Sequence, residues 1–186
     1  LRPENAPLLL TDHEQRIDLF TEIGIDYLYL LQFNEQRAET SDRDFVADVL
    51  VDRMNAKLIV VGSNFHFGKA RSGSVDSLRD FGDEMGFEVI GMDLFAEDDA
   101  VEPVSSTVIR RALAGGDIAA ANAMLGRAYE VRGQVIQGDQ RGRTIGFPTA
   151  NVAFKPGQAW PAQGVYAAWV TLEDGRRVTA AVNIGM

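Results

Sequence analysis

The sequence has 186 residues, of which 46% are hydrophobic and 24% are charged, as is typical of a soluble globular protein. Its formal net charge of −9 argues against a nucleic-acid-binding protein, because such proteins use many cations to neutralise phosphates. A few local cations can still bind a small phosphorylated ligand. There is no cysteine and no apolar run near the roughly 20 residues of a membrane span, so we expect no disulfide, no thiolate metal site, no membrane segment and a cytoplasmic location.

The chain opens with a helical pattern followed by a strand pattern. A capping box at Thr11 and Glu14 predicts the start of the first helix, and Gly24 predicts its end. Residues 25–33 then favour a strand, because apolar and aromatic side chains dominate them.

The alternation of helix and strand continues to residue 95. Residues 41–56 predict a helix capped by Ser41, and residues 57–62 form a short apolar run typical of a strand buried on both faces of a parallel sheet. Residues 74–86 favour a helix and residues 87–95 a strand, so this part of the chain predicts an α/β domain with right-handed crossovers. The side chains expected to face inward from the helix at 41–56 are Phe45, Val46, Val49, Leu50 and Met54.

The pattern changes after two short helices expected at residues 105–115 and 117–126. Short alternating strands follow, including a hairpin expected to turn on two residues, Asp174 and Gly175. Many glycines between short strands indicate a small antiparallel β-barrel. We therefore place a domain boundary between residues 125 and 126.

A glycine-rich loop follows the apolar strand and spans residues 62–73. In open α/β sheets, ligands bind beyond the carboxyl ends of the strands, where this loop lies. Its glycines allow close backbone approach, its phenylalanines suit a planar ring, and its cations suit phosphate. The alternative is a solvent loop whose phenylalanines fill the core, and the residues alone do not decide between the two. The candidate ligand-binding residues are Gly62, Asn64, Phe65, Phe67, Gly68, Lys69 and Arg71.

A second candidate lies at the expected helix start around residue 105. Ser105, Ser106 and Thr107 combine hydroxyl groups with free backbone N–H groups, which together make an anion site. Arg110 follows Ser106 by four residues and so faces the same side of the helix. The alternative, which these residues alone favour, is an ordinary N-cap.

A third polar segment spans residues 138–151, and its composition argues against both a helix and a central strand. Residues i and i+2 of an extended chain project to the same side, so Thr149 and Asn151 should present two hard oxygens together, as Mg²⁺ and its nucleotide phosphates require. The glycines of the segment could wrap phosphates while its arginines supply charge. The alternative is a long, flexible β-connection, and the segment offers no evident base for phosphoryl transfer. The candidate residues are Gly138, Arg141, Arg143, Gly146, Pro148, Thr149 and Asn151.

In chain order, the three segments read GSNFHFGKARSG, VSSTVIR and GRTIGFPTAN. Together they resemble the bacterial bifunctional riboflavin kinase/FMN adenylyltransferase (FAD synthetase) family over essentially the whole chain. The resemblance implies a Rossmann-like nucleotidyltransferase domain over residues 1–125 and a small antiparallel, riboflavin kinase-like β-barrel domain over residues 126–186.

The resemblance also implies the chemistry. The barrel domain would phosphorylate riboflavin with ATP to give FMN, and the N-terminal domain would adenylylate FMN to FAD with release of pyrophosphate. Both reactions would use Mg²⁺, with riboflavin, FMN and ATP as the small-molecule partners and no nucleic acid or membrane as a partner.

The resemblance assigns roles to particular residues. Asn64 and Arg110 would act in adenylyl transfer, while Thr149 and Asn151 would act at the Mg²⁺ and ATP of the kinase. The residues implied to line the adenylyltransferase site are Gly62, Asn64, Phe65, Phe67, Gly68, Ser105, Ser106, Thr107 and Arg110. The kinase motif maps to Pro148, Thr149, Ala150 and Asn151.

Two further expectations and two alternatives complete the interpretation. In the family, a glycine- and histidine-containing loop is expected before residue 1, and a Pro-Thr segment with the glutamate base of the kinase is expected after residue 186.

One alternative is a nucleotidyltransferase for another substrate, such as phosphopantetheine or nicotinate mononucleotide, which leaves residues 127–186 without an explanation. The other alternative is a non-catalytic flavin- or nucleotide-binding module.

Overall fold

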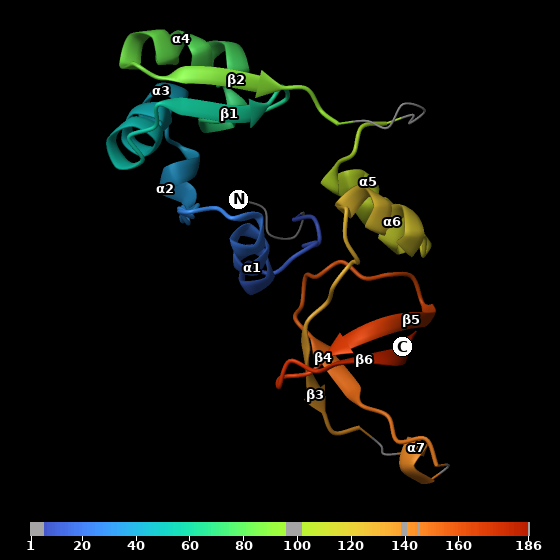
Figure 1. The fold of residues 1–186 in the computed structure, drawn as a ribbon. Coiled ribbons are helices and arrows are strands. Elements are labelled where there is room, and N and C mark those ends of the chain that lie inside the picture. The colour runs from blue at the N-terminus through green and yellow to red at the C-terminus, as the bar shows by residue number, and fades with distance from the viewer. Residues whose placement is uncertain (1–5, 96–101, 139–140, 145, 186) are drawn as a thin grey trace. The chain divides into compact units, whose positions relative to one another are not determined.

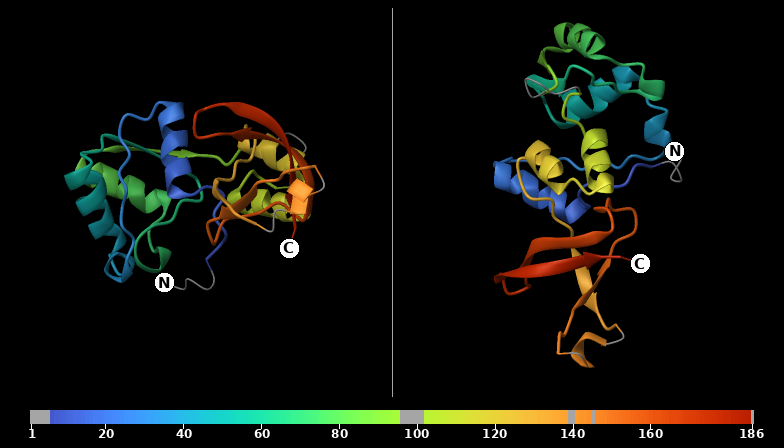
Figure 2. Two further views of the ribbon diagram at one scale, coloured as in Figure 1. Left: turned by 90° about the horizontal axis from the view of Figure 1, so that it is seen from below. Right: turned by 90° about the vertical axis from the view of Figure 1, so that its right-hand side faces the viewer.

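The computed structural model describes residues 6–95, 102–138, 141–144 and 146–185 (Figure 1 and Figure 2). The chain forms two compact units that do not follow the order of the sequence. The first unit contains Tyr29–Val104, and the second unit combines Ala6–Leu28 with Ser105–Met186. No helix in the described ranges is long and apolar enough to cross a membrane.

A two-stranded parallel sheet organises the first unit. Strand β1 (Leu58–Gly62) pairs with β2 (Glu88–Met92), and helix α4 (Val75–Met85) connects them. A parallel pair needs such a crossover, because its second strand must start at the same end as the first. Ser74 caps α4 through a capping box with Ser77, and Gly86 ends it at a positive φ of 82°. The remaining elements of the unit are α2 (Glu35–Ala38), α3 (Asp42–Phe45), the π-helical η2 (Val46–Arg53) and the short 3₁₀ turn η3 (Lys69–Arg71).

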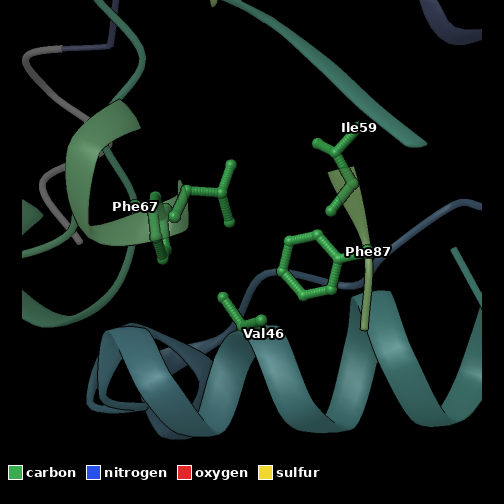
Figure 3. Packing of buried hydrophobic residues seen from close by; sticks show 5 residues of the cluster. Val46, Ile59, Phe67 and Phe87 are labelled. Carbon is green, nitrogen blue, oxygen red and sulfur yellow. The ribbon is translucent and has the colours of Figure 1, made fainter. Parts of the chain in front are cut away.

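The core of the first unit lies where η2 and α4 meet the β-strands. Val46, Ile59, Phe67, Leu78 and Phe87 form one buried cluster (Figure 3). Each side chain of this size contributes roughly 1.5–3 kcal/mol when it leaves water. Five separate elements or loops supply the cluster, one residue each, so the loop of Phe67 packs in the same core as the helices.

Three expectations for residues 25–62 need correction. The helix expected over 41–56 begins at its Ser41 cap as predicted, but it turns into a π-helix at Val46 and ends at Arg53, which leaves Met54 51% exposed rather than inward. Strand β1 is not buried on both faces, because Ile59 and Val61 pack in the core while Leu58 and Val60 are about half exposed.

The third correction concerns residues 25–33, which form no strand. Their apolar side chains are largely exposed, and Tyr27 is 94% exposed. An apolar, aromatic pattern becomes a strand only where a neighbouring strand supplies hydrogen-bond partners, and no described strand pairs with this segment.

The second unit begins with α1 (His13–Ile23). Its N-cap is Asp12 rather than the expected Thr11, and its capping box closes on Gln15 rather than on Glu14. The Asp12 carboxylate accepts from the Gln15 backbone N–H at 2.8 Å, while the Gln15 side chain accepts from the Asp12 N–H at 2.9 Å. The predicted stop at Gly24 is confirmed, with φ at 86°.

The rest of the second unit consists of two helices and two strand pairs. Helices α5 (Ser106–Gly115) and α6 (Ile118–Leu125) precede β3 (Gly133–Ile136), which pairs antiparallel with β4 (Asn151–Phe154). Strand β5 (Gly164–Thr171) forms a hairpin with β6 (Arg177–Ile184).

The hairpin between β5 and β6 confirms the predicted position but not the predicted length of the turn. Leu172 and Arg176 still pair through their backbones at 2.9 Å, so the loop has three residues, Glu173–Gly175, with Gly175 at φ 82°. A three-residue loop with its last residue left-handed is a common alternative to the two-residue turn.

Arg141–Thr144 form a single helical turn, α7, at the far end of the β3–β4 pair (Figure 1 and Figure 2). The expectation that residues 138–151 contain no helix is therefore wrong for these four residues. The two compact units and the predicted domains divide the chain differently, and the boundary between residues 125 and 126 stays a prediction.

Candidate active sites

The loop after β1 turns sharply at the carboxyl end of the parallel pair. The Ser63 N–H donates to the Met92 carbonyl at 2.7 Å, and the Phe65 N–H donates back to the Gly62 carbonyl at 2.9 Å. Asn64 is exposed at the tip of this turn, and a Cβ on Gly62 would lie 3.2 Å from its side-chain oxygen. The loop therefore offers one polar amide at the edge where ligands of α/β sheets bind.

The two phenylalanines of this loop have different environments. Phe67 is buried in the core cluster, where its ring stacks on Phe65 with centroids 5.5 Å apart and tilts against Phe45 at 5.9 Å. Gly73 lies against the Phe67 ring, where a Cβ would come within 2.6 Å of it. Phe67 therefore fills the core, as the alternative interpretation held, and the half-buried Phe65 is the ring that retains surface for a planar ligand.

The cations of this loop also differ. The Lys69 ammonium pairs with Glu39 at 2.5 Å, so its charge is already neutralised. Arg71 is exposed, adopts a left-handed φ of 62°, and has no ion-pair partner among the described residues. Gly68, at φ 72°, packs so closely on the Asp42 backbone that a Cβ there would lie 2.6 Å from the Asp42 nitrogen. Arg71 is therefore the cation of this loop that remains available to phosphate.

The start of α5 carries the second candidate set, in the other compact unit. Ser105 is the N-cap, and its hydroxyl accepts from the Val108 N–H at 3.3 Å. Ser106 and Thr107 are exposed in the first turn. The Arg110 Nε donates to the Leu8 carbonyl at 2.5 Å, which orients the guanidinium and uses one of its five N–H donors. Ser105 thus serves as a cap, whereas its two neighbours and Arg110 remain candidates for phosphate contact.

The third candidate set lies around two glycines, Gly138 and Gly142. The Phe147 N–H donates to the Gly142 carbonyl at 2.8 Å, which folds the chain back on itself. A Cβ on Gly142 would lie 3.1 Å from the Thr149 hydroxyl, and a Cβ on Gly138 would overlap the Asn151 amide. The Thr149 side chain therefore borders Gly142, and the Asn151 side chain borders Gly138.

The remaining predicted residues of this segment are only partly described. Pro148 is exposed and Gly146 has a φ of 81°, a conformation that favours glycine. Arg141 and Arg143 belong to α7, but their side chains lie outside the described residues, as does all of Asp139.

A magnesium ion at this site would depend on oxygen ligands. Within the described ranges, no group of three His, Cys, Asp or Glu side chains is placed to hold a metal. The Thr149 hydroxyl and the Asn151 amide oxygen are hard donors, and a Cβ on either neighbouring glycine would press on one of these side chains. These residues fit a Mg²⁺ ion that takes its other ligands from nucleotide phosphates and water.

One further feature was not predicted from the sequence. A cavity of about 250 Å³ lies between the start of α1 and the loop after β4. Its charged lining residues include Asp12, Glu14 and Lys155, which come from opposite ends of the sequence and carry no local motif. None of the predicted site residues lines this cavity.

Two family models match the chain in succession. The FAD synthetase model matches residues 1–108, and the riboflavin kinase model matches residues 125–186. The first match contains the loop after β1 and the start of α5, and the second contains the Thr149–Asn151 segment.

Curated relatives match over nearly the whole chain. The bifunctional riboflavin kinase/FMN adenylyltransferase of Escherichia coli K12 is 36% identical over 98% of this chain and 57% of its own length. The protein of the same name from Buchnera aphidicola subsp. Schizaphis graminum is 31% identical over all of this chain and 59% of its own length. The chain therefore spans somewhat more than half the length of these relatives.

A solved structure from Streptococcus pneumoniae, titled a macrolide-efflux protein, is also similar to this chain. It matches with a TM-score of 0.84 and 32% identity, over 96% of this chain and 56% of its own length. Since the FAD synthetase model covers more than half of the chain and the riboflavin kinase model follows it, the chain belongs to the FAD synthetase family of bifunctional riboflavin kinase/FMN adenylyltransferases, as its three polar segments predicted.

Proposed function

We propose that the intact protein makes FAD from riboflavin in two steps, each of which consumes one ATP. The observation that carries this proposal is the succession of an FAD synthetase match and a riboflavin kinase match along one chain. We assign adenylylation to a Rossmann-like domain over residues 1–125 and phosphorylation to a riboflavin kinase-like β-barrel over residues 126–186. The parallel β1–β2 pair and the two antiparallel strand pairs support these folds.

The proposed kinase reaction uses the third candidate set. The terminal ribityl hydroxyl oxygen of riboflavin attacks the γ-phosphorus of ATP, ADP leaves with the electrons of the broken P–O bond, and the hydroxyl proton passes to a base. Thr149 and Asn151 would hold a Mg²⁺ ion, which when bound neutralises charge on the phosphate oxygens. The backbone at Gly138 and Gly142 would lie against the nucleotide phosphates. Residues 141–154 contain no carboxylate, so we place the base elsewhere in the intact protein.

The proposed adenylyl transfer uses the first two candidate sets. A phosphate oxygen of FMN attacks the α-phosphorus of ATP, and pyrophosphate leaves with the bridging oxygen. The nucleophile is already an anion, so no strong base is needed, and binding of the phosphate charge dominates catalysis. Ser106, Thr107, the backbone N–H groups at the start of α5 and Arg110 would bind the triphosphate. Asn64 and Arg71 are the residues of the loop after β1 that we assign to adenylyl transfer.

Isotope labelling separates the two proposed steps in one experiment. The intact protein is incubated with riboflavin, Mg²⁺ and ATP labelled either at the γ-phosphate or at the α-phosphate, and the flavins are separated by chromatography. We expect label from the γ-phosphate in FMN and FAD, and label from the α-phosphate in FAD alone. Absence of both flavin products overturns the proposal. Tight flavin binding without turnover would instead establish the binding-module alternative, and labelled product from another mononucleotide would establish the different nucleotidyltransferase.

A further inference from the structure

A segment from the beginning of the chain belongs to the same compact unit as the strands of the riboflavin kinase match. We call this segment, Leu8–Ile23, the clasp. It includes α1 and the extended residues before it, and residues 29–104 separate it in sequence from the rest of its unit. The clasp contacts Arg110 through the Leu8 carbonyl, Glu130 and Arg132 before β3, and the loop Lys155–Ala159 after β4. The proposed reactions give no role to its contacts with the loop after β4.

The backbone contacts of the clasp fix the loop after β4. The Leu9 N–H donates to the Gly157 carbonyl at 2.7 Å, and the Ala159 N–H donates to the Leu9 carbonyl at 2.8 Å. Leu9 and Gln158 thereby form an isolated parallel bridge, and Gln158 is only 4% exposed. The Tyr129 hydroxyl donates to the Ala159 carbonyl at 2.7 Å. The loop is therefore bonded both to the clasp and to the strand region before β3.

Charged groups reinforce the same contact. The Lys155 ammonium lies 2.9 Å from an Asp12 carboxylate oxygen and 3.3 Å from Glu14. The other Asp12 oxygen caps α1, and the Asp12 side chain is 12% exposed against 57% for Lys155. The Gln15 amide also donates to the Glu130 carbonyl at 3.0 Å, and Arg132 pairs with Asp18 at 2.5 Å.

These contacts bear on the candidate kinase site through β4. Asn151 begins β4 and Lys155 directly follows it, so only the three residues Val152–Phe154 separate the clasp contact from Asn151. β4 pairs with β3 alone among the described strands. We infer that the clasp, through Lys155 and the Leu9 bridge, holds β4 so that Asn151 stays against Gly138 and Thr149 against Gly142. Lys155 is then a positioning residue for riboflavin phosphorylation, an inference that rests on the proposed kinase function.

The test compares four changes in the intact protein. Lys155→Glu places a carboxylate opposite Asp12 and Glu14 and should open the contact. Lys155→Arg keeps the cation, and Lys155→Glu combined with Glu14→Lys restores one ion pair in reverse. Arg176→Glu is the matched control, because Arg176 is in the same unit and pairs with Asp174 at 2.6 Å rather than with a residue of the clasp. If Lys155→Glu fails to fold, Lys155→Met takes its place.

Hydrogen–deuterium exchange of the ligand-free variants gives the first measurement. We expect faster exchange of peptides covering residues 8–12 and 151–159 in Lys155→Glu, because the amides of Leu9 and Ala159 lose their partners when the contact opens. Lys155→Arg and the reversed pair should exchange like the wild type, and so should Arg176→Glu. Unchanged exchange in Lys155→Glu overturns the clasp, whether or not the protein is a kinase.

Steady-state kinetics give the second measurement. In Lys155→Glu we expect the KM for ATP in riboflavin phosphorylation to rise about tenfold, since small displacements of positioning groups weaken the bound geometry. The KM of FMN adenylylation should change less, because the clasp offers Arg110 one backbone contact, from the Leu8 carbonyl. Lys155→Arg should recover the kinase KM. Faster exchange with an unchanged kinase KM overturns the positioning role. Absence of kinase activity in the wild type would overturn the proposed function and the positioning role with it, while the exchange result would still decide the clasp contact.

Discussion

The side-chain amide of Asn151 lies against the backbone of Gly138, so closely that a Cβ on residue 138 would overlap it. Gly138 lies just beyond the end of β3, and Asn151 begins β4, its antiparallel partner. A residue larger than glycine at position 138 would displace the Asn151 amide. The geometry of the candidate kinase site therefore depends on a glycine at this position.

Gly138→Ala should impair riboflavin phosphorylation and spare the fold. The atom that must move is the end of the Asn151 side chain rather than a backbone, so the free energy of unfolding should change by less than about 1 kcal/mol while the amide is displaced from its position. We expect the kinase kcat/KM to fall on the order of tenfold. The control is Gly115→Ala at the end of α5, where a Cβ meets nothing within 4 Å. Equal kinase activity in the two variants would contradict the role of Gly138.

Asn151→Ala and Arg110→Ala should have opposite effects on the two reactions. Asn151→Ala removes an oxygen proposed to hold Mg²⁺ in the kinase and should lower FMN formation on the order of 100-fold, with FMN-to-FAD conversion nearly intact. Arg110→Ala removes a cation proposed to bind the triphosphate during adenylylation and should do the reverse. Each reaction is measured separately, starting from riboflavin or from FMN. If both folded variants lost both activities equally, the assignment of two sites would be wrong.

Local signals in the sequence predicted several parts of the fold. Gly24 and Ser41 were identified as helix ends from their residue types alone, because a left-handed stop and a hydroxyl cap depend on one or two residues. The capping box at the start of α1 was misplaced by one residue. Thr11 and Asp12 both have capping side chains, and the structure selects Asp12, which also pairs with Lys155 at 2.9 Å.

Features that depend on distant residues were predicted poorly. The apolar residues 25–33 have a strand pattern, but the described chain offers them no partner strand. The sequence left two roles open for Phe67, and its burial beside Val46 and Leu78 assigns it to the core. The clasp was not predicted, because the ion pair of Asp12 and Lys155 spans 143 residues of sequence. The motif segments, in contrast, identified the family that the relatives confirm.

Gly82→Ala should destabilise the first unit although alanine favours helices. Gly82 is buried in α4, and a Cβ there would lie 2.5 Å from the Phe87 carbonyl oxygen and 3.2 Å from its ring. The backbone of β2 or the helix must shift, so we expect a loss of roughly 1–3 kcal/mol in the free energy of unfolding. Gly115→Ala meets no such atom and should be neutral or gain up to about 1 kcal/mol. Urea unfolding measures the free energy of unfolding of both variants. Equal values for Gly82→Ala and Gly115→Ala would contradict the close packing at Gly82.

The clasp should weaken in acid. The pKa of Asp12 lies below its ordinary value, chiefly because the Gln15 backbone N–H and then the Lys155 ammonium bond to its carboxylate. Because the pKa of Asp12 is lower in the folded protein than in the unfolded chain, its ionised carboxylate stabilises the fold. This contribution is complete above the unfolded pKa of about 3.9 and is lost as the pH falls through the folded pKa. Asp12→Asn keeps a capping side chain without the charge, so its stability between pH 2 and 6 should vary less than that of the wild type. Parallel pH profiles in urea unfolding would contradict this prediction.

The Tyr129 phenol should make the second unit sensitive to alkali. Burial raises the pKa of Tyr129 to about 12, and the phenol donates its proton to the Ala159 carbonyl. Because the folded pKa exceeds the unfolded pKa of about 10, this group stabilises the fold fully below pH 10 and loses that contribution as the pH rises toward 12. Tyr129→Phe should be less stable than the wild type at pH 8, with a difference that shrinks between pH 10 and 12. Tyr27→Phe, which removes a phenol that is 94% exposed, should follow the wild-type profile. A constant stability difference between Tyr129→Phe and the wild type across this range would show that the buried phenol does not couple ionisation to folding.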